Sequence, residues 1–441
     1  MCSIPNPLFE INYQILLIFY PWIFFELHFI FTKQKSLLRH MMDEKIDALD
    51  RISDLPEFIM HHILSFLPRK EAGKTSLLSK KWNCVWSSFP ILDFDQCHYV
   101  KNNGSLYQGT RNKKRVKRFM NIVDKSFGRF HEHKFRLQKF KLHMTLVDFK
   151  LASLVDKWIE WAFAHDAKEI DLVVMTREKT YALTRATFVE QSTNGCKLER
   201  AFSRSAVKFY SLQKLSLRDI CVNEETIQDI IHTCPFITDV DIIVCKGLKT
   251  VEISKLPKLR YFNLVSHKRD VECVKIEAPN LQYFRFSGSE QCLLDITACK
   301  DLKELCLDEL NITDQLFHLN VSRFPLLESL VVSDCDMLGR IKISAQRLRD
   351  LRISGCQKLL DVEIDAPSLS FFRYFNNGDK MAKIFSKNAP CPLEFNLILD
   401  THHVDTQWLL KLRELLLISN QRKTLRIVVF CREVCSLMQV Y

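Results

Sequence analysis

The sequence predicts an α/β fold in which a short helical module near the N-terminus is followed by a solenoid of repeated short parallel strands. The pattern L-x-x-L-x-L, with other apolar residues in place of some leucines, begins at residues 281, 302, 327, 348 and 369. A second series of the same pattern begins at residues 248, 271, 338 and 359, half a period out of phase. Upstream, residues 50–89 carry apolar side chains at helical spacing. Regular repeats of this kind indicate a solenoid, because each repeat buries its apolar face only against its neighbours.

Two helices are predicted in the N-terminal module. Pro56 suits the first turn of a helix, because its missing N–H would have no partner there, and Glu57 favours the helix dipole. Pro68 ends this first helix. The apolar residues three and four apart are Phe58, Ile59, Ile63, Phe66 and Leu67 in the first helix and Leu78, Trp82, Val85, Trp86 and Phe89 in the second. About forty residues are too few to bury all these side chains on one another, so the module is expected to bind a partner.

Two other interpretations apply to this module. The run AGKTS, residues 72–76, is similar to the end of a phosphate-binding loop, but that motif requires a glycine where Pro68 stands. The sequence therefore argues against nucleotide binding. A helical hairpin packed on the rest of its own domain is the alternative that stays open.

The same segment resembles an F-box of the plant type. The residues that carry the resemblance are Leu55, Pro56, Ile59, Ile63, Leu64, Ser65, Phe66, Leu67, Pro68, Ala72, Thr75, Ser76, Leu78, Ser79, Lys80, Trp82 and Trp86. The resemblance implies that the module, residues 50–96, docks onto the Skp-type adaptor of a cullin ubiquitin ligase. It assigns adaptor contacts to Leu55, Pro56, Ile59, Ile63, Leu64, Leu67 and Trp82. Gly73 departs from the apolar residue usual at its position, and a helical glycine costs about 1 kcal/mol.

Each repeat of the solenoid is predicted to hold two short strands, one on each side of a slab, with the leucines turned inward. The period of 21 to 25 residues is typical of leucine-rich repeats, which build horseshoe-like solenoids. Four less regular repeats lead back toward the F-box and begin at Leu137, Ala167, Leu212 and Ile237. Helices are expected at residues 150–165 and 223–233, and Asn223 is a suitable N-cap for the second. Residues 177–208 fit an irregular insertion or a degenerate repeat.

Cysteine recurs at one place in the repeats. Cys245, Cys335 and Cys356 each stand eight residues after the first apolar residue of their pattern, and Asn377 takes the same place after Leu369. Leucine-rich repeats place Asn or Cys there to satisfy backbone groups in the turn. We therefore interpret these cysteines as structural residues and not as ligands.

An F-box followed by such repeats also resembles the plant-type F-box/leucine-rich-repeat family, over about residues 50–376. The solenoid itself is assigned to residues 119–376. Residues 377–441 match the family less well. They are predicted to form a strand, a helix and a last strand that cap the end of the solenoid.

The first 41 residues form an apolar leader. Residues 11–25 hold no charge, but a helix of this length reaches about 22 Å against about 30 Å of hydrocarbon. Lys33, Lys35 and Arg39 follow the apolar run, which disfavours a secretory signal and would place the F-box on the cytoplasmic side of a membrane. Two interpretations stay open: a membrane anchor facing the cytosol, and an extension outside the functional module.

Charge and cysteine usage narrow the function classes. The net charge is +11, and six basic residues lie among the eight at positions 111–118. We interpret them as part of a solvated basic linker, residues 97–118, or as a nuclear import signal; no aromatic residues alternate with them, so no nucleic-acid partner is expected. The sixteen cysteines show no zinc-binding spacing, so reduced thiols and no metal or cofactor are expected.

These observations predict a non-enzymatic adaptor without catalytic residues. By resemblance, the F-box would tether the chain to a cullin complex, and the solenoid would present a protein substrate for ubiquitination in the cytoplasm, the nucleus or both. If the first strand series lines the concave face, its outward residues would read the substrate. The candidates are Lys303, Glu304, Glu328, Arg349, Arg352 and Arg373, and plain solvated surface is the alternative for each.

A membrane-tethered leucine-rich-repeat scaffold without a ligase role is the alternative function. It would require the leader to insert into a membrane and the glycosylation sequons at Asn103, Asn311 and Asn320 to be lumenal. Glycosylation of any of these asparagines would contradict the ubiquitin interpretation.

Overall fold

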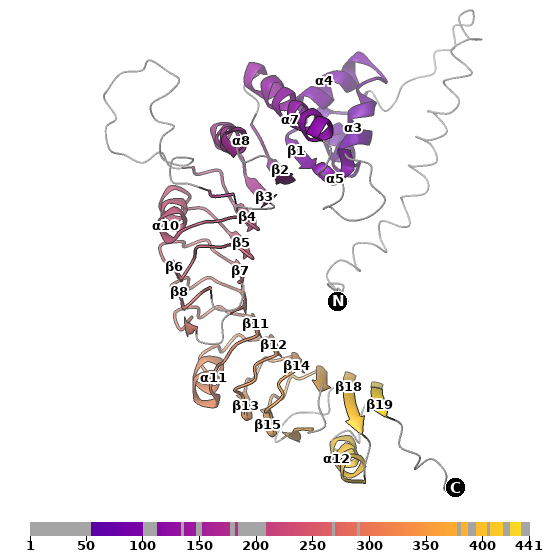
Figure 1. Ribbon diagram of the computed structural model, residues 1–441, viewed down its shortest axis with the longest axis vertical. Coiled ribbons are helices and arrows are strands. Elements are labelled where there is room, and N and C mark those ends of the chain that lie inside the picture. The colour runs from indigo at the N-terminus through magenta and orange to yellow at the C-terminus, as the bar shows by residue number, and fades with distance from the viewer. Residues whose placement is uncertain are drawn as a thin grey trace, which may run out of the picture. The chain divides into compact units, whose positions relative to one another are not determined.

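A computed structural model shows parallel strands stacked side by side along a solenoid (Figure 1). The structure describes residues 54–99, 113–133, 136–146, 152–176, 181–183, 209–266, 270–288, 292–376, 381–386, 394–403, 406–417 and 424–433. The chain divides between Ile59 and Met60 into two units, and the solenoid lies in the second. The leader, Asn103, Asn377 and nearly all of residues 177–208 lie outside the described residues.

In the described part of the chain, thirteen strands form one parallel sheet in chain order, which confirms the predicted solenoid. They are β1 (Ile91–Asp95), β2 (Lys139–Leu146), β3 (Glu169–Thr176), β4 (Lys214–Arg218), β5 (Asp239–Ile243), β7 (Tyr261–Val265), β9 (Tyr283–Ser287), β11 (Glu304–Asp308), β12 (Ser329–Ser333), β14 (Asp350–Ser354), β16 (Phe371–Asn376), β18 (Glu394–His403) and β19 (Thr424–Glu433). Neighbouring strands pair residue for residue from their first positions, so equivalent residues of successive repeats form rows across the sheet.

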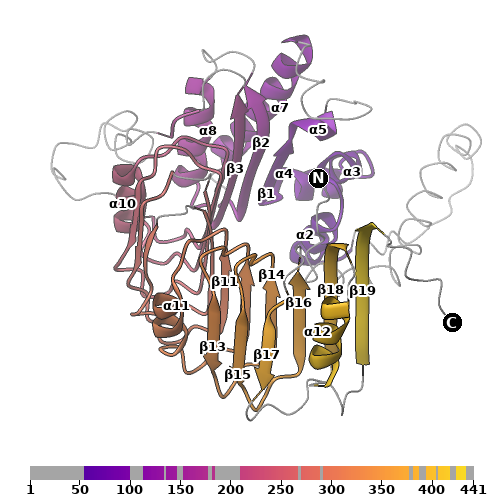
Figure 2. The same ribbon diagram turned by 60° about the horizontal axis from the view of Figure 1, so that its bottom comes forward.

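The second strand series forms two smaller parallel sheets. One contains β6 (Thr250–Ile253), β8 (Cys273–Ile276) and β10 (Leu293–Asp295), and the other contains β13 (Arg340–Ser344), β15 (Asp361–Asp365) and β17 (Lys383–Ser386). Figure 2 shows β13, β15 and β17 alongside the strands of the large sheet. The four predicted strands of this series are β6, β8, β13 and β15, whereas β10 and β17 were not predicted.

Helices form the N-terminal module and also take the place of the second strand in several repeats. They are α2 (Glu57–Ser65), α3 (Arg69–Thr75) and α4 (Lys80–Ser88) before the first strand of the large sheet, and α5 (Gln96–Tyr99), α7 (Lys113–His133), α8 (Ala152–Ala164), α10 (Glu224–Thr233), α11 (Asp314–Val321) and α12 (Thr406–Leu417) after it. The predicted α8 and α10 are present, and the Asn223 side chain caps α10 by accepting a hydrogen bond from the backbone N–H of Thr226 at 3.0 Å. Among the described residues, no helix is long and apolar enough to cross a membrane.

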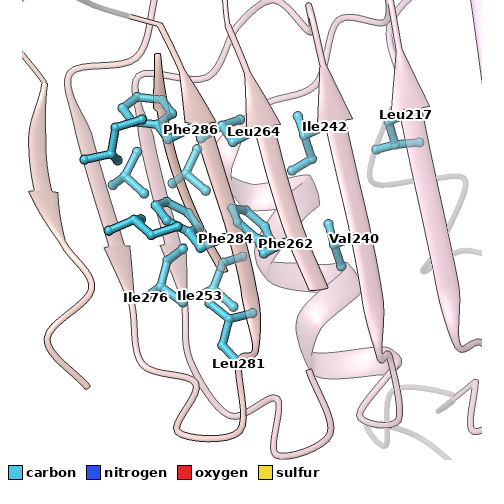
Figure 3. Packing of buried hydrophobic residues seen from close by; sticks show 14 of the residues in the cluster. Leu217, Val240, Ile242, Ile253, Phe262, Leu264, Ile276, Leu281, Phe284 and Phe286 are labelled. Carbon is cyan, nitrogen blue, oxygen red and sulfur yellow. The ribbon is translucent and has the colours of Figure 1, made fainter. Parts of the chain in front are cut away.

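The core of the solenoid is a set of apolar rows between the sheets. Figure 3 shows Phe262, Phe284 and their neighbours on the large sheet facing Ile253 and Ile276 on the smaller one. The rings of Phe262 and Phe284 lie parallel, with centroids 6.1 Å apart. From β1 to β18, the second and fourth residues of the large-sheet strands are buried, because successive side chains of a strand point to opposite faces. On the last strand, β19, the fourth residue, Ile427, is 38% exposed.

The predicted role of the cysteines is confirmed by their contacts. Cys245, Cys335 and Cys356 are buried, and their thiols donate to backbone carbonyls of Leu217, Ser333 and Ser354 at 3.4, 3.3 and 3.5 Å. Each thiol therefore pairs with backbone carbonyl groups at the turn after a strand.

Left-handed residues end several strands of the large sheet. Asp219, Val244, Glu309 and Asp334, each directly after a strand, have φ between 50° and 55°, and Gly355 has φ 69°. The backbone N–H groups of the four non-glycine residues donate to the last carbonyl of the next strand, as from Asp334 to Ser354 at 2.9 Å, and that of Gly355 donates to the carbonyl of Phe375 on β16 at 3.1 Å. The turn thus continues the hydrogen-bond ladder beyond the strand.

The structure adds detail to three predicted segments. Strand β1 lies within the segment assigned to the F-box and pairs with β2 as the first strand of the large sheet. The predicted basic linker, residues 97–118, overlaps two helices, because α5 occupies Gln96–Tyr99 and α7 begins at Lys113. The predicted strand–helix–strand tail is present, and its strands β18 and β19 continue the large sheet in register.

Strand β7 was also missed, although Leu259, Phe262 and Leu264 repeat the same apolar pattern. Its existence makes the repeat series continuous from β5 to β9.

We expect Gly355→Ala and Gly128→Ala to have opposite effects on stability. At Gly355 the left-handed backbone disfavours alanine, and a new Cβ would collide with the carboxylate of Asp334. The free energy of unfolding should fall by about 2 kcal/mol. Gly128 lies within α7 with open space around it, so alanine should raise stability by up to about 1 kcal/mol. Urea unfolding followed by circular dichroism measures the free energy of unfolding of both variants. Changes of the same sign would contradict the different backbone environments given to Gly355 and Gly128.

Candidate functional site

The helical module has a small core of its own. α2 buries Met60 and Leu64, and α4 buries Trp82 and Val85. The Ser79 side chain caps α4 by accepting a hydrogen bond from the backbone N–H of Trp82 at 3.2 Å. The module also leaves large apolar side chains in solvent, with Phe58, Phe66 and Leu77 exposed by 69%, 53% and 82%. Such exposed apolar surface is typical of a protein interaction site.

The predicted adaptor contacts divide into two groups. Pro56 is exposed, and the half-buried residues are Leu55, Ile59, Ile63 and Leu67. Leu64 is fully buried and Trp82 is 4% exposed, so the structure assigns both to the core of the module and not to a free surface. Helical spacing alone did not separate the two faces of α2, because apolar residues occur on both. Phe58 and Leu77, which were not among the predicted contacts, are more exposed than Leu55, Ile59, Ile63 and Leu67.

Arg69 joins the helical module to the solenoid. It stands at the start of α3 and donates one hydrogen bond to the carbonyl of Ile91 on β1 and another to Oγ of Ser126 on α7, both at 3.1 Å. Its guanidinium carbon lies 4.3 Å from the ring centre of Phe94 and 5.2 Å from that of Trp86. One side chain therefore links α3, α4, α7 and the first strand of the large sheet. The planar guanidinium suits this role, since it donates in its plane and stacks on its faces.

A cavity of about 300 Å³ lies beside this junction. It is lined by residues of α2, α3 and β1 and of the turns between them, including Leu64, Leu67, Phe89 and Ile91. Arg69 forms part of its wall.

The outward face of the large sheet is the second candidate surface. The third residues of its strands form one continuous row, which we call the middle row. The middle row is Asp93, Lys141, Asp171, Ser216, Asp241, Asn263, Arg285, Cys306, Val331, Arg352, Arg373, Asn396 and Arg426. Most of its members are polar, as expected for the face opposite the core.

Near its start, the middle row is acidic and paired. The carboxylate of Asp171 lies 3.1 Å from Nε2 of His143, and Nδ2 of Asn263 donates to Asp241 at 2.8 Å. Burial alone would raise the pKa of Asp171, but the hydrogen bond and charge of His143 bring it below its ordinary value. This carboxylate is therefore stabilised as an anion by its own neighbours.

The predicted substrate residues occupy three positions relative to the large-sheet strands. Lys303, Glu328 and Arg349 directly precede β11, β12 and β14, and each carbonyl accepts hydrogen bonds from the next repeat. Glu304 begins β11, and burial raises its pKa, with the charges of Asp350 and Glu328 adding to the effect. Only Arg352 and Arg373 lie in the middle row, where they are register partners on β14 and β16.

Sequence reasoning missed other outward residues. Tyr261 and Tyr283 stack with ring centroids 4.5 Å apart, and Arg285 lies 3.5 Å from the carboxylate of Asp308. Arg426 extends the middle row onto β19. The sequence pattern alone could have identified these residues, because outward residues stand two and four positions after the first apolar residue of each repeat.

Among the described residues, no group of three His, Cys, Asp or Glu side chains is placed to hold a metal ion. Burial raises the pKa of the Cys234 thiol to about 12 and that of the Cys306 thiol to about 11. Both thiols are therefore protonated at neutral pH and are poor nucleophiles.

Comparisons with known proteins match both parts of the chain. Residues 52–94 match the F-box domain, and residues 130–298 and 292–389 match the family described as At1g61320/AtMIF1, LRR domain. The chain is 27% identical to the putative F-box/LRR-repeat protein At3g18150 of Arabidopsis thaliana, over 66% of this chain and 60% of that protein. It is 28% identical to F-box/LRR-repeat protein At5g02910 of the same plant, over 56% of this chain and 50% of that protein. The chain thus spans 50% to 60% of the length of these relatives.

We expect Arg69→Met to lower the free energy of unfolding by about 2 to 4 kcal/mol. The change removes two hydrogen bonds and leaves the Ile91 carbonyl and the Ser126 hydroxyl short of a donor. The neighbouring Lys70 is exposed, so Lys70→Met removes one positive charge without these contacts and should change stability by less than about 0.5 kcal/mol. Urea unfolding of both variants provides the comparison, and equal midpoints would refute the role given to Arg69.

Proposed function

Because the chain belongs to the F-box/leucine-rich-repeat family, we propose that it is the substrate-recognition subunit of a cullin-type ubiquitin ligase. In this role the helical module binds a Skp-type adaptor, and the solenoid binds the protein to be ubiquitinated. The observation that carries the proposal is the F-box match over residues 52–94, which coincides with the helices that leave apolar side chains exposed. The chain itself performs no chemistry in this proposal.

The adaptor surface of the proposal is built mainly on α2. Its contacts are Leu55, Pro56, Ile59, Ile63 and Leu67, with Leu64 and Trp82 supporting them from the core. Phe58 and Phe66 add exposed apolar area on the same helix and the turn after it. Burial of such side chains against a partner removes apolar surface from water, which favours association.

The substrate surface of the proposal is the outward face of the large sheet. Its polar middle row, together with Lys303, Glu304, Glu328 and Arg349 at the strand starts, offers hydrogen-bonding groups that the core does not use. A row of this kind presents one side chain per repeat, so a substrate contacts several repeats at once.

The contacts of Arg69 support a protein with two separate binding surfaces. A ligase of this type works by holding the substrate near the reactive ubiquitin, so the gain in rate depends on how well the two binding surfaces are fixed relative to each other. Arg69 connects α3 to β1 and α7 through hydrogen bonds and ring contacts. In the proposal, this link limits movement between the adaptor-binding helices and the first repeat. We place the protein in the cytoplasm, the nucleus or both, where cullin complexes act.

The test is a pull-down of the full chain with a Skp-type adaptor. A variant with Leu55→Ala, Pro56→Ala and Ile59→Ala should lose at least about 2 kcal/mol of binding, or more than tenfold in affinity, because truncated apolar anchors are the costly changes in an interface. The matched control is Leu409→Ala with Leu410→Ala, which removes exposed apolar side chains from α12 instead.

The control variant should bind the adaptor as the unchanged chain does. Absence of adaptor binding by the unchanged chain, or equal binding by both variants, would count against the ligase proposal.

A further inference from the structure

Charge is unevenly distributed along the middle row of the large sheet. From β1 to β5 the row contains Asp93, Lys141, Asp171, Ser216 and Asp241, so carboxylates outnumber basic side chains there. From β12 to β19 it contains Val331, Arg352, Arg373, Asn396 and Arg426, and no carboxylate. The C-terminal part of the middle row is therefore a basic strip, defined here by Arg352, Arg373 and Arg426.

Two guanidinium groups of the basic strip are held against one ring. The guanidinium carbon of Arg352 lies 5.2 Å from the ring centre of Phe371, and that of Arg373 lies 5.5 Å from the same centre. Asp350 neutralises Arg352 through two hydrogen bonds of 3.0 and 2.7 Å. Like charges at this separation repel each other, and only one of the two has its own counter-charge.

Arg373 is the unneutralised member of the pair. Its Nε is buried and has no hydrogen-bond partner, and within the described part of the chain neither Arg373 nor Arg426 forms an ion pair. Glu394 is on the same face and is exposed, but it makes no ion pair with either arginine. Burial lowers the pKa of Arg373, the charges of Arg352 and Arg426 lower it further, and the charge of Asp350 opposes them. An anion supplied by a binding partner would give the guanidinium of Arg373 the direct counter-charge that it lacks.

The spacing of the strip indicates the form of that anion. Neighbouring strands are about 4.8 Å apart, so the backbone positions of Arg352 and Arg426, three strands apart, are separated by about 14 Å. A single small anion does not reach both ends. An extended peptide covers that distance with about four or five residues and places carboxylates along it.

We propose that the basic strip binds an acidic segment of the protein substrate, rich in Asp and Glu, laid across strands β14 to β19. Arg373 and Arg426 receive the carboxylates, while the Arg352–Asp350 pair and Phe371 hold Arg373 in place. The inference rests on the proposed function, since it names the class of substrate that the solenoid would select.

The test measures binding of the full chain to a fluorescently labelled decaglutamate peptide, with decaglutamine as the neutral comparison. Fluorescence anisotropy at about 50 mM and about 300 mM salt separates charge-dependent binding from other binding. The acidic peptide should bind more tightly than the neutral one, and high salt should weaken its binding. Arg373→Gln combined with Arg426→Gln should weaken it about tenfold, since charge-assisted hydrogen bonds are lost.

The matched control is Arg347→Gln, because Arg347 is an exposed arginine in the turn before β14 and outside the strip. It should change peptide binding less than about twofold. Equal effects of the two changes, or equal binding of both peptides, would overturn the inference. The thermal midpoint of each variant shows whether that variant is folded. If the glutamine variants unfold, Arg373→Lys is compared with Arg347→Lys instead, because lysine keeps the positive charge.

Adaptor binding by the same preparations distinguishes this inference from the proposed function. A chain that binds the adaptor but does not prefer the acidic peptide overturns the inference and leaves the adaptor role standing. A chain that prefers the acidic peptide through Arg373 and Arg426 but does not bind the adaptor supports the strip and overturns the ligase proposal.

Discussion

The whole solenoid depends on the burial of apolar side chains between neighbouring repeats. No repeat buries its own apolar residues; Phe262 is covered by Phe284 of the next strand and by Ile253 and Ile276 of the facing sheet. Because the strands are parallel and pair without a shift, every repeat places the same positions inward. The same constraint sends the third residue of each strand outward, and so creates the middle row as a by-product of the core.

This constraint also explains why the repeats tolerate variation on one side. The large sheet is continuous from β1 to β19, whereas the other side changes between short strands and the helices α8, α10 and α11. A parallel strand needs a crossover connection, and either a helix or a strand supplies it as long as apolar residues face the sheet. Recognition of a partner by the outward face is therefore compatible with an irregular opposite side.

The helical module depends on a different kind of interaction. Its core around Leu64 and Trp82 is small, and its attachment to the solenoid relies on Arg69 and the ring contacts of Trp86 and Phe94. A small module with exposed apolar side chains is suited to binding another protein, since that protein completes its burial. In the basic strip, Arg373 and Arg426 similarly have no ion-pair partner among the described residues. On both proposed binding surfaces, therefore, the chain leaves side chains without full burial or without a counter-charge of their own.

The sequence by itself determined the α/β solenoid, the period of its repeats, the F-box resemblance, the N-cap at Asn223 and the structural role of Cys245. These follow from local spacing, because strand alternation, helix periodicity and capping involve residues close together in the chain. Only the tertiary structure decided that Leu64 and Trp82 are core residues, that β1 belongs to the large sheet, and that Arg69 joins two parts of the molecule. It also decided that Arg352 and Arg373 share one ring while Lys303, Glu328 and Arg349 lie at the strand starts. The physical reason is that burial and charge pairing depend on residues that are distant in sequence, such as Arg69 and Ser126, which the pattern of either segment does not reveal.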